Sequence, residues 1–187
     1  MASGPSMLEI DLSIVEQSGW RTMAVNNTHQ LAPWADVMYA GDMAWWQQYG
    51  QATAGFQGEK WTRDEQAARL FRLHHVRRVD GTGLCRDRGC VNSGGNSGYQ
   101  AVNLAWHFGA RSIILLGFDM HRNTSGHWHG EHPRGMLSAP ASHIAKWRHN
   151  FTALAADLAR SRCKVINATP GSALDCFPRK TLEEALC

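Results

Sequence analysis

The sequence has no long hydrophobic run. No apolar stretch approaches the roughly 20 residues that cross a bilayer, and the N-terminus lacks the basic and then apolar pattern of a secretion signal. The sequence also lacks a strong excess of positive or negative residues, because the formal net charge is only +3 over 187 residues. We therefore expect a cytoplasmic protein without a membrane span. Its mild basicity suits an anionic small-molecule ligand and does not by itself indicate nucleic acid.

Cysteine is present in an odd number, five. Cys85 and Cys90 are separated by four residues rather than the two typical of a zinc knuckle, and the other cysteines are scattered. This usage predicts free thiols in a reducing compartment rather than a disulfide framework or a zinc site.

Hydrophobic residues make up 43% of the chain, which is enough for one domain with a real core. Short apolar runs alternate with segments of helical periodicity, and the runs end in Gly, Asn, Asp or Ser. This order predicts an α/β fold: a single Rossmann-like domain, 1–187, with a mostly parallel sheet. Strands are expected at 21–25, 36–40, 74–79, 112–116 and 164–167, and helices at 12–17, 43–49, 62–71, 98–108, 139–160 and 182–186.

The stretch 92–120 joins a glycine-rich loop to a helix and then to a buried strand. Backbone amides at Asn96, Ser97 and Gly98, with the positive end of the helix dipole behind them, would form an anion site. The alternative is a flexible loop that only connects. Asp119 follows the strand, so its carboxylate is expected at the strand's carboxyl end.

Other polar clusters also follow the expected strands, and open parallel sheets bind ligands at that edge. Asn26 and Asn27 carry donors and acceptors that suit a base or a ribose, although an Asn-rich turn explains them equally well. Asp42 is either the N-cap of the following helix or a ligand contact. The set expected to converge is Gly4, Pro5, Ser6, Asn26, Asn27, Asn96, Ser97, Gly98, Asp119 and Ser172.

A histidine-rich stretch without hydrophobic periodicity follows Asp119 and predicts a lid at about 120–139. His127, His129 and His132 could ligate zinc or another divalent cation together with Asp119. We favour a second interpretation, in which these imidazoles serve as general base and phosphate contact near neutral pH. A polar surface loop is the third.

Three motifs occur in a fixed order along the chain: GPSMLEID at 4–11, AVNN at 24–27 and NSGYQAVNLAWHFGARSIILLGFDM at 96–120. This ordered set resembles the bacterial sialyltransferases of glycosyltransferase family 42, and their wider relatives, the motility-associated flagellin glycosyltransferases and 6-hydroxymethylpterin diphosphokinase-like proteins. The sequences HWHGEHP at 127–133 and INATPGSALDCFPR at 166–179 also look like short proteins of phages and prophages.

The resemblance implies a cytidine-monophosphate-sugar donor. Gly4, Pro5 and Ser6 would pack on the nucleotide, Asn26 and Asn27 would contact its base or ribose, and Ser97 and Gly98 would hold phosphate or sugar. His143, just before the long helix, matches a general base that acts without metal. Three departures are that Ser3 stands in place of Asn, Asn27 in place of Gln, and His121 in place of a phosphate-binding Tyr.

The resemblance also implies a central strand ahead of the GPS turn, where this sequence has only Met1–Ser3. Either that strand lies upstream, or another segment covers the sheet edge.

Together these features predict a transferase that uses a nucleotide-activated donor to modify an acceptor hydroxyl. One alternative is ATP-dependent diphosphate transfer or metal-dependent phosphoester hydrolysis at the histidine loop. Another is a non-catalytic nucleotide-binding accessory protein of a phage. The acceptor has no signature in the sequence.

Overall fold

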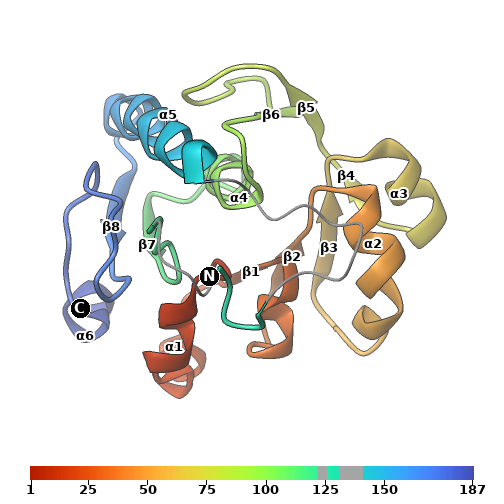
Figure 1. Ribbon diagram of the computed structural model, residues 1–187, viewed down its shortest axis with the longest axis horizontal. Helices are drawn as coiled ribbons and strands as arrows, with labels where there is room; N and C mark the ends of the chain where they lie inside the picture. The colour runs from red at the N-terminus through yellow and green to blue at the C-terminus, as the bar shows by residue number, and fades with distance from the viewer. Residues whose placement is uncertain (122–125, 131–140) are drawn as a thin grey trace.

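The protein is described by a computed structural model that covers residues 1–121, 126–130 and 141–187. It is an α/β protein in which the strands of every sheet pair in parallel (Figure 1). The largest sheet has four strands in the order β1-β2-β3-β4, while β5 pairs with β6 and β7 pairs with β8. The strands are β1 (Met23–Val25), β2 (Val37–Tyr39), β3 (Glu59–Thr62), β4 (His74–His75), β5 (Arg77–Val79), β6 (Cys90–Asn92), β7 (Ser112–Leu115) and β8 (Lys164–Asn167).

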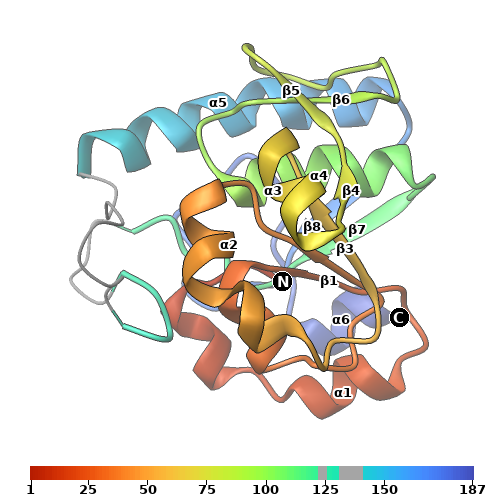
Figure 2. The same ribbon diagram turned by 90° about the vertical axis from the view of Figure 1, so that its right-hand side faces the viewer.

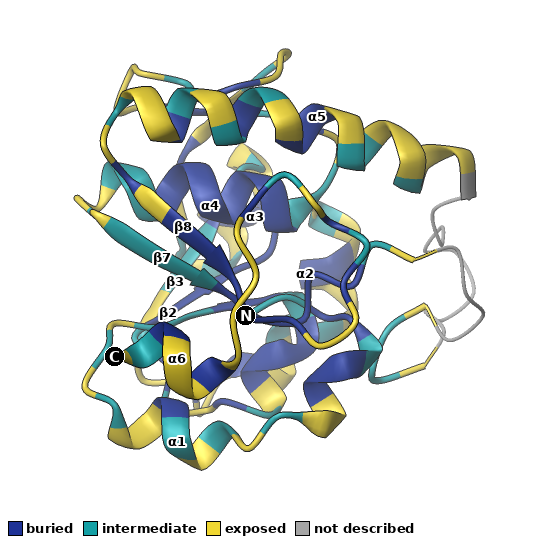
Figure 3. Ribbon diagram, turned by 90° about the vertical axis from the view of Figure 1, so that its left-hand side faces the viewer, coloured by how far each residue is buried: buried dark blue, intermediate teal, exposed yellow. Residues whose placement is uncertain are grey.

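Helices cover both faces of these strands, with α4 and α5 on one side and α1 and α6 on the other (Figure 1). Helix α4 is almost wholly buried, whereas α5 exposes its outer face (Figure 3). Within the described residues, no helix is both long and apolar enough for a membrane span. The α-helices are α1 (Leu12–Gln17), α2 (Met43–Tyr49), α3 (Glu65–Phe71), α4 (Ser97–His107), α5 (Ala141–Arg160) and α6 (Leu182–Leu186), and the 3-10 helices are η1 (Pro5–Glu9), η2 (Asn26–Gln30) and η3 (Gly50–Thr53).

The core forms where apolar faces of these helices meet the strands. Aromatic and leucine side chains of α4 and α5 pack on β7 and β8, and Val15 of α1 and Leu182 of α6 pack on the opposite face. In α4 the helical spacing of apolar residues indicates the buried side correctly at Ala101, Val102 and Leu104, whereas Phe108 at the end of the helix is 46% exposed.

The helix expected at 62–71 is partly wrong. Glu59–Thr62 is strand β3, and α3 begins only at Glu65, with the Asp64 carboxylate accepting the amide of Ala67 at 2.9 Å. The Thr62 hydroxyl does not close a capping box with Glu65, because it accepts the amide of Asp64. Strand β6 was also not predicted, because it lies in a polar, glycine-rich segment that indicates a loop. Both strands are only three or four residues long, so the pairing partner decides their conformation.

The N-terminal residues lie between β1 and β7, where Figure 1 shows the chain start. The Met1 amine donates to the carbonyl of Met23 at 2.8 Å, and the amide of Val25 donates to the Met1 carbonyl at 2.9 Å. On the other side, the amide of Ala2 donates to the Leu116 carbonyl at 2.7 Å. Met1–Gly4 therefore covers part of the edge that the central strand was expected to fill, and it links the two sheets.

Stability should rise with pH through the titration of the Met1 amine. Burial lowers the pKa of this amine to about 5 from an ordinary 8.0. The amine itself is enclosed, although Met1 as a whole stays partly exposed. Between pH 5 and 8 the unfolded chain binds a proton that the folded chain does not, so the free energy of unfolding should rise by up to about 1.4 kcal/mol per pH unit.

Urea denaturation at several pH values, on the free and the N-terminally acetylated chain, measures this term. Acetylation removes the titrating amine and leaves the histidines, so the acetylated chain should show a smaller rise between pH 5 and 8. Parallel curves for the two chains would contradict the prediction.

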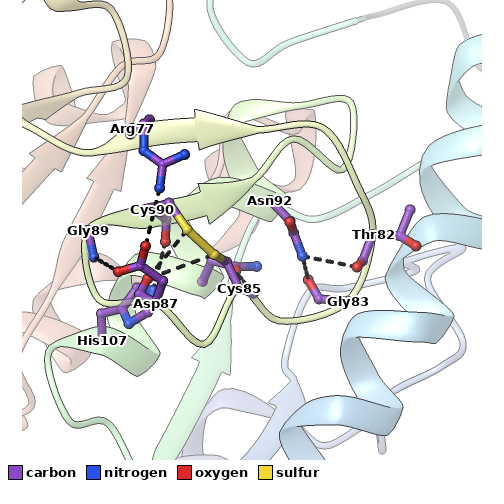
Figure 4. Close-up of a disulfide and its surroundings, with 10 residues drawn as sticks. Arg77, Thr82, Gly83, Cys85, Asp87, Gly89, Cys90, Asn92 and His107 are labelled. Carbon is purple, nitrogen blue, oxygen red and sulfur yellow. Dashed lines mark hydrogen bonds and ion pairs between the residues drawn. A yellow bond between two sulfur atoms is a disulfide. The ribbon is translucent and has the colours of Figure 1, made fainter.

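Cys85 and Cys90 form a disulfide, so the expectation of free thiols is wrong for these two residues (Figure 4). The loop between them turns back on itself, and their Cα atoms lie 6.3 Å apart, within reach of a disulfide. Spacing alone did not reveal this turn. Cys163, Cys176 and Cys187 are free thiols, as expected.

Candidate functional site

The N-terminal turn and the end of β7 form the most tightly connected part of the expected site. The amide of Ser6 donates to one carboxylate oxygen of Asp119 at 3.0 Å, and the Ser6 hydroxyl donates to the other at 2.8 Å. Gly4 lies against the same carboxylate, since a Cβ at Gly4 would be 1.7 Å from its Oδ2. Asp119 is buried, with 8% of its surface exposed. This arrangement favours a positioning role for Asp119, which holds the turn in place.

The two asparagines after β1 lie in different surroundings. Asn27 is buried, and its Oδ1 accepts the indole N–H of Trp45 at 2.7 Å, so this side chain anchors α2. Asn26 is partly exposed and has a left-handed backbone with φ of 52°. The neighbouring Thr28 hydroxyl shares a hydrogen bond with the Ser3 hydroxyl at 3.1 Å. Of the pair, Asn26 is thus the one that can face a ligand.

The glycine-rich loop leads into α4 as expected. Asn96 is the N-cap, and its side chain accepts the amide of Tyr99 at 2.9 Å. The amides of Ser97 and Gly98 belong to the first turn, where a helix offers no internal acceptor. A Cβ at Gly98 would lie 2.9 Å from the ring of Phe118, so α4 approaches the end of β7 closely. These amides therefore lie close to the strand end that carries Asp119.

Arg63 is a candidate residue that the sequence reasoning missed. It directly follows β3 and forms an ion pair with Asp42, which directly follows Gly41. A Cβ at Gly41 would lie 3.1 Å from Arg63 Nε and 3.4 Å from the Ser97 hydroxyl. The guanidinium, whose side chain is 23% exposed, thus lies close to the first turn of α4. Recognition of 59–62 as a strand would have revealed it as a strand-end residue.

Buried hydrogen bonds fix the position of α4 relative to β2. The Tyr39 hydroxyl donates to Gln100 Oε1 at 2.7 Å, and Gln100 Nε2 donates to the Ser93 carbonyl at 2.9 Å. Burial raises the pKa of Tyr39 well above its ordinary value, so this hydroxyl remains protonated and keeps its donor role. Asp42 stands at the N-cap position of α2 but makes no side-chain capping bond, which leaves its carboxylate to Arg63.

Part of the expected lid docks on the N-terminal turn. The amide of Trp128 donates to the Ser3 carbonyl at 3.0 Å, and its indole N–H donates to the Thr28 hydroxyl at 3.3 Å. Figure 2 shows 126–130 on the same side of the molecule as the first turn of α5. The rings of His127 and His129 stack with centroids 5.1 Å apart. His132 and the lid residues at 122–125 and 131–139 lie outside the described residues.

The two other histidines predicted to belong to the site, His143 and His121, are solvent-exposed. His143 lies in the first turn of α5, 6.3 Å between ring centroids from Trp147. Trp147 in turn packs on the glycine loop, since a Cβ at Gly95 would be 2.5 Å from its indole. His143 therefore lies one helical turn before Trp147, the residue that packs on the loop preceding α4. His121 is exposed two residues after Asp119.

The Ser172 side chain is buried and holds neighbouring loops together. Its hydroxyl donates to the Phe118 carbonyl at 2.6 Å and accepts from Asn167 Nδ2 at 2.9 Å.

Across residues 1–121, 126–130 and 141–187, no three His, Cys, Asp or Glu side chains are grouped to hold a metal ion. The donor groups that do converge at the strand ends are backbone amides, hydroxyls and one guanidinium, which suit an anion.

No protein-family model, curated protein or solved structure matches the chain.

Proposed function

We propose that the chain is a Rossmann-like transferase that binds a nucleotide-activated donor at the carboxyl ends of its strands. One observation carries the proposal: loops far apart in the sequence meet along one rim. Gly4 contacts Asp119, Gly98 approaches Phe118, and Gly41 lies between Arg63 and Ser97. Glycines at these contacts let the loops approach one another closely.

The donor phosphate would bind at the first turn of α4. Amides of Ser97 and Gly98 and the helix dipole would share its negative charge with the Arg63 guanidinium, which can form charge-assisted hydrogen bonds. The base or ribose would lie beside Asn26 and the Gly4–Ser6 turn. Asp42 would hold Arg63 in position when no donor is bound.

The proposed reaction is direct displacement. The oxygen of an acceptor hydroxyl forms a bond to the donor sugar carbon, the bond from that carbon to the phosphate oxygen breaks, and the nucleoside monophosphate leaves with the electron pair. His143 or a lid histidine, His127 or His129, would take the hydroxyl proton. Charge on the leaving phosphate would be stabilised by the groups that bind it in the donor.

Calorimetric titration with nucleotides and nucleotide sugars tests the proposal. Cytidine monophosphate and its sugar conjugate should bind to the folded chain, and extended incubation of the conjugate with acceptor hydroxyl compounds should release free nucleotide. The absence of binding by every nucleotide, with the chain folded, would refute the function. Binding with recovery of intact donor would instead favour the accessory-protein alternative. If elemental analysis finds a stoichiometric metal in the purified protein and turnover depends on that metal, metal-dependent phosphoester hydrolysis would be favoured instead.

A further inference from the structure

Positive charge is concentrated in one short segment of the chain. Residues 72–90 contain five arginines, two aspartates and no lysine or glutamate, so their formal charge is +3, equal to that of the whole chain. All five arginines are exposed. They lie after α3, in β5 and in the loop closed by the disulfide, and they are Arg72, Arg77, Arg78, Arg86 and Arg88.

The disulfide loop, Cys85–Cys90, is fixed on the carboxyl-terminal half of α4. The amide of Cys85 donates to Asn103 Oδ1 at 2.9 Å, and His107 Nε2 donates to the Cys90 carbonyl at 2.8 Å. Asn103 and His107 are one helical turn apart, so both ends of the loop are attached to the same side of α4 (Figure 4).

Arg77 supports the loop from β5. Its amide donates to the Gly89 carbonyl at 3.0 Å, and its guanidinium pairs with Asp87 at 3.2 Å. Arg86 and Arg88 flank Asp87 and form no ion pair with any described residue. Two guanidiniums on a fixed backbone are therefore available to an anionic partner, which need not order the loop when it binds.

Aromatic rings lie beside these arginines. The Trp61 indole stacks on the His74 imidazole with centroids 4.9 Å apart, and the Phe108 ring meets Trp61 edge-on at 5.2 Å. Phe108 is 46% exposed and directly follows His107, which holds the disulfide loop. His74 is exposed and precedes Arg77 by three residues. We call this region the basic aromatic surface, defined by Trp61, His74, Arg77, Arg86, Arg88 and Phe108.

We propose that the basic aromatic surface binds single-stranded nucleic acid. The guanidiniums would contact phosphates, and the exposed rings would stack on unpaired bases, which a duplex does not offer. The surface lies at the carboxyl-terminal end of α4. The proposed nucleotide site is at the other end of this 11-residue helix, roughly 16 Å away. The inference is therefore independent of the proposed function.

The acidic side chains of this region are compatible with such a partner. Asp80 pairs with Arg78 at 3.2 Å, so its charge is balanced within the protein, as Arg77 balances that of Asp87. Glu59 accepts the indole N–H of Trp61 at 2.8 Å and so orients the ring. An acidic peptide would satisfy the arginines but would leave the exposed aromatic rings without a stacking partner.

Fluorescence anisotropy of a labelled oligothymidylate of about 20 nucleotides tests the proposal. The double variant Arg86→Gln/Arg88→Gln should bind about 10- to 30-fold more weakly at about 0.1 M salt. Its slope of log K against log salt should be shallower by about 1.4, the value for two phosphate contacts on a single strand. Phe108→Ala should weaken binding by about tenfold and leave the slope unchanged, because stacking releases no counterions.

Arg21→Gln/Arg69→Gln is the matched control. Arg21 precedes β1 and Arg69 lies on α3, both are exposed, and each pairs with one carboxylate. This variant loses the same net charge, and its affinity should stay within about twofold of the parent because salt screens distant charges.

Equal losses in the two double variants would overturn the proposal, because net charge alone would then account for binding. Polyglutamate or a DNA duplex of the same length that binds as tightly as the single strand would also overturn it. Displacement of the strand by cytidine monophosphate would place it at the strand-end loops instead. No saturable binding at micromolar strand would equally refute the assignment.

Discussion

Replacement of Gly4 by Ala should lower the free energy of unfolding by about 3 kcal/mol, because the added Cβ has no space. That Cβ would lie 1.7 Å from Asp119 Oδ2 and 2.5 Å from the Gly117 carbonyl oxygen. The backbone of Gly4, at φ −66° and ψ 155°, suits any residue, so the cost comes from the contact alone. Relief of the contact requires the turn to separate from the strand end.

Urea denaturation of the variant measures this cost, and Gly55→Ala is the matched control. A Cβ at Gly55 meets no atom within 4 Å, so that variant should be as stable as the parent or slightly more stable. If Gly4→Ala unfolds at the same urea concentration as Gly55→Ala, the close packing of the turn on Asp119 is refuted. Loss of nucleotide binding in the folded Gly4→Ala chain would further link the turn to the ligand.

Replacement of Arg63 by Gln should weaken nucleotide binding by about 10- to 100-fold, the value of a charge-assisted hydrogen bond. The guanidinium lies close to Ser97 and the first turn of α4, where the donor phosphate is proposed to bind. The fold should survive, because Asp42 is 58% exposed and its carboxylate remains hydrated without its partner.

Arg69→Gln is the control for this variant. Arg69 pairs with Glu65 on the exposed surface of α3, so its replacement removes the same charge without changing the strand-end loops of the proposed site. Calorimetric titration of both variants with cytidine monophosphate at one ionic strength compares them directly. Equal affinities for the two variants would show that Arg63 does not contact the phosphate and would remove it from the site.

Strong local signals allowed much of the fold to be predicted. The glycine loop and the apolar periodicity that follows it agree with each other, and the structure has that helix at Ser97–His107. The strand expected at 112–116 is confirmed as β7, Ser112–Leu115, and that at 164–167 as β8. In these segments local preference and tertiary packing favour the same conformation.

Tertiary context decided the remainder. Glu59–Thr62 has one fully buried residue and owes its strand conformation to pairing with β2 and β4. The polar, glycine-rich segment before α4 contains β6 because Cys90–Asn92 pairs there with β5, Arg77–Val79. Since Arg63 follows a strand that the sequence does not reveal, its place at the rim was not predictable. The engagement of Asp119 with Ser6 also depends on a contact between residues 113 positions apart.

The convergence of strand-end loops into a nucleotide site is tested most directly by a titration of the isotope-labelled chain with cytidine monophosphate, followed through its amide resonances. The account predicts saturable shifts at Asn26, Gly41, Ser97 and Gly98, and none at Arg69 on the exposed face of α3. Shifts confined to residues away from the strands' carboxyl ends, or no shifts at millimolar nucleotide, would contradict it.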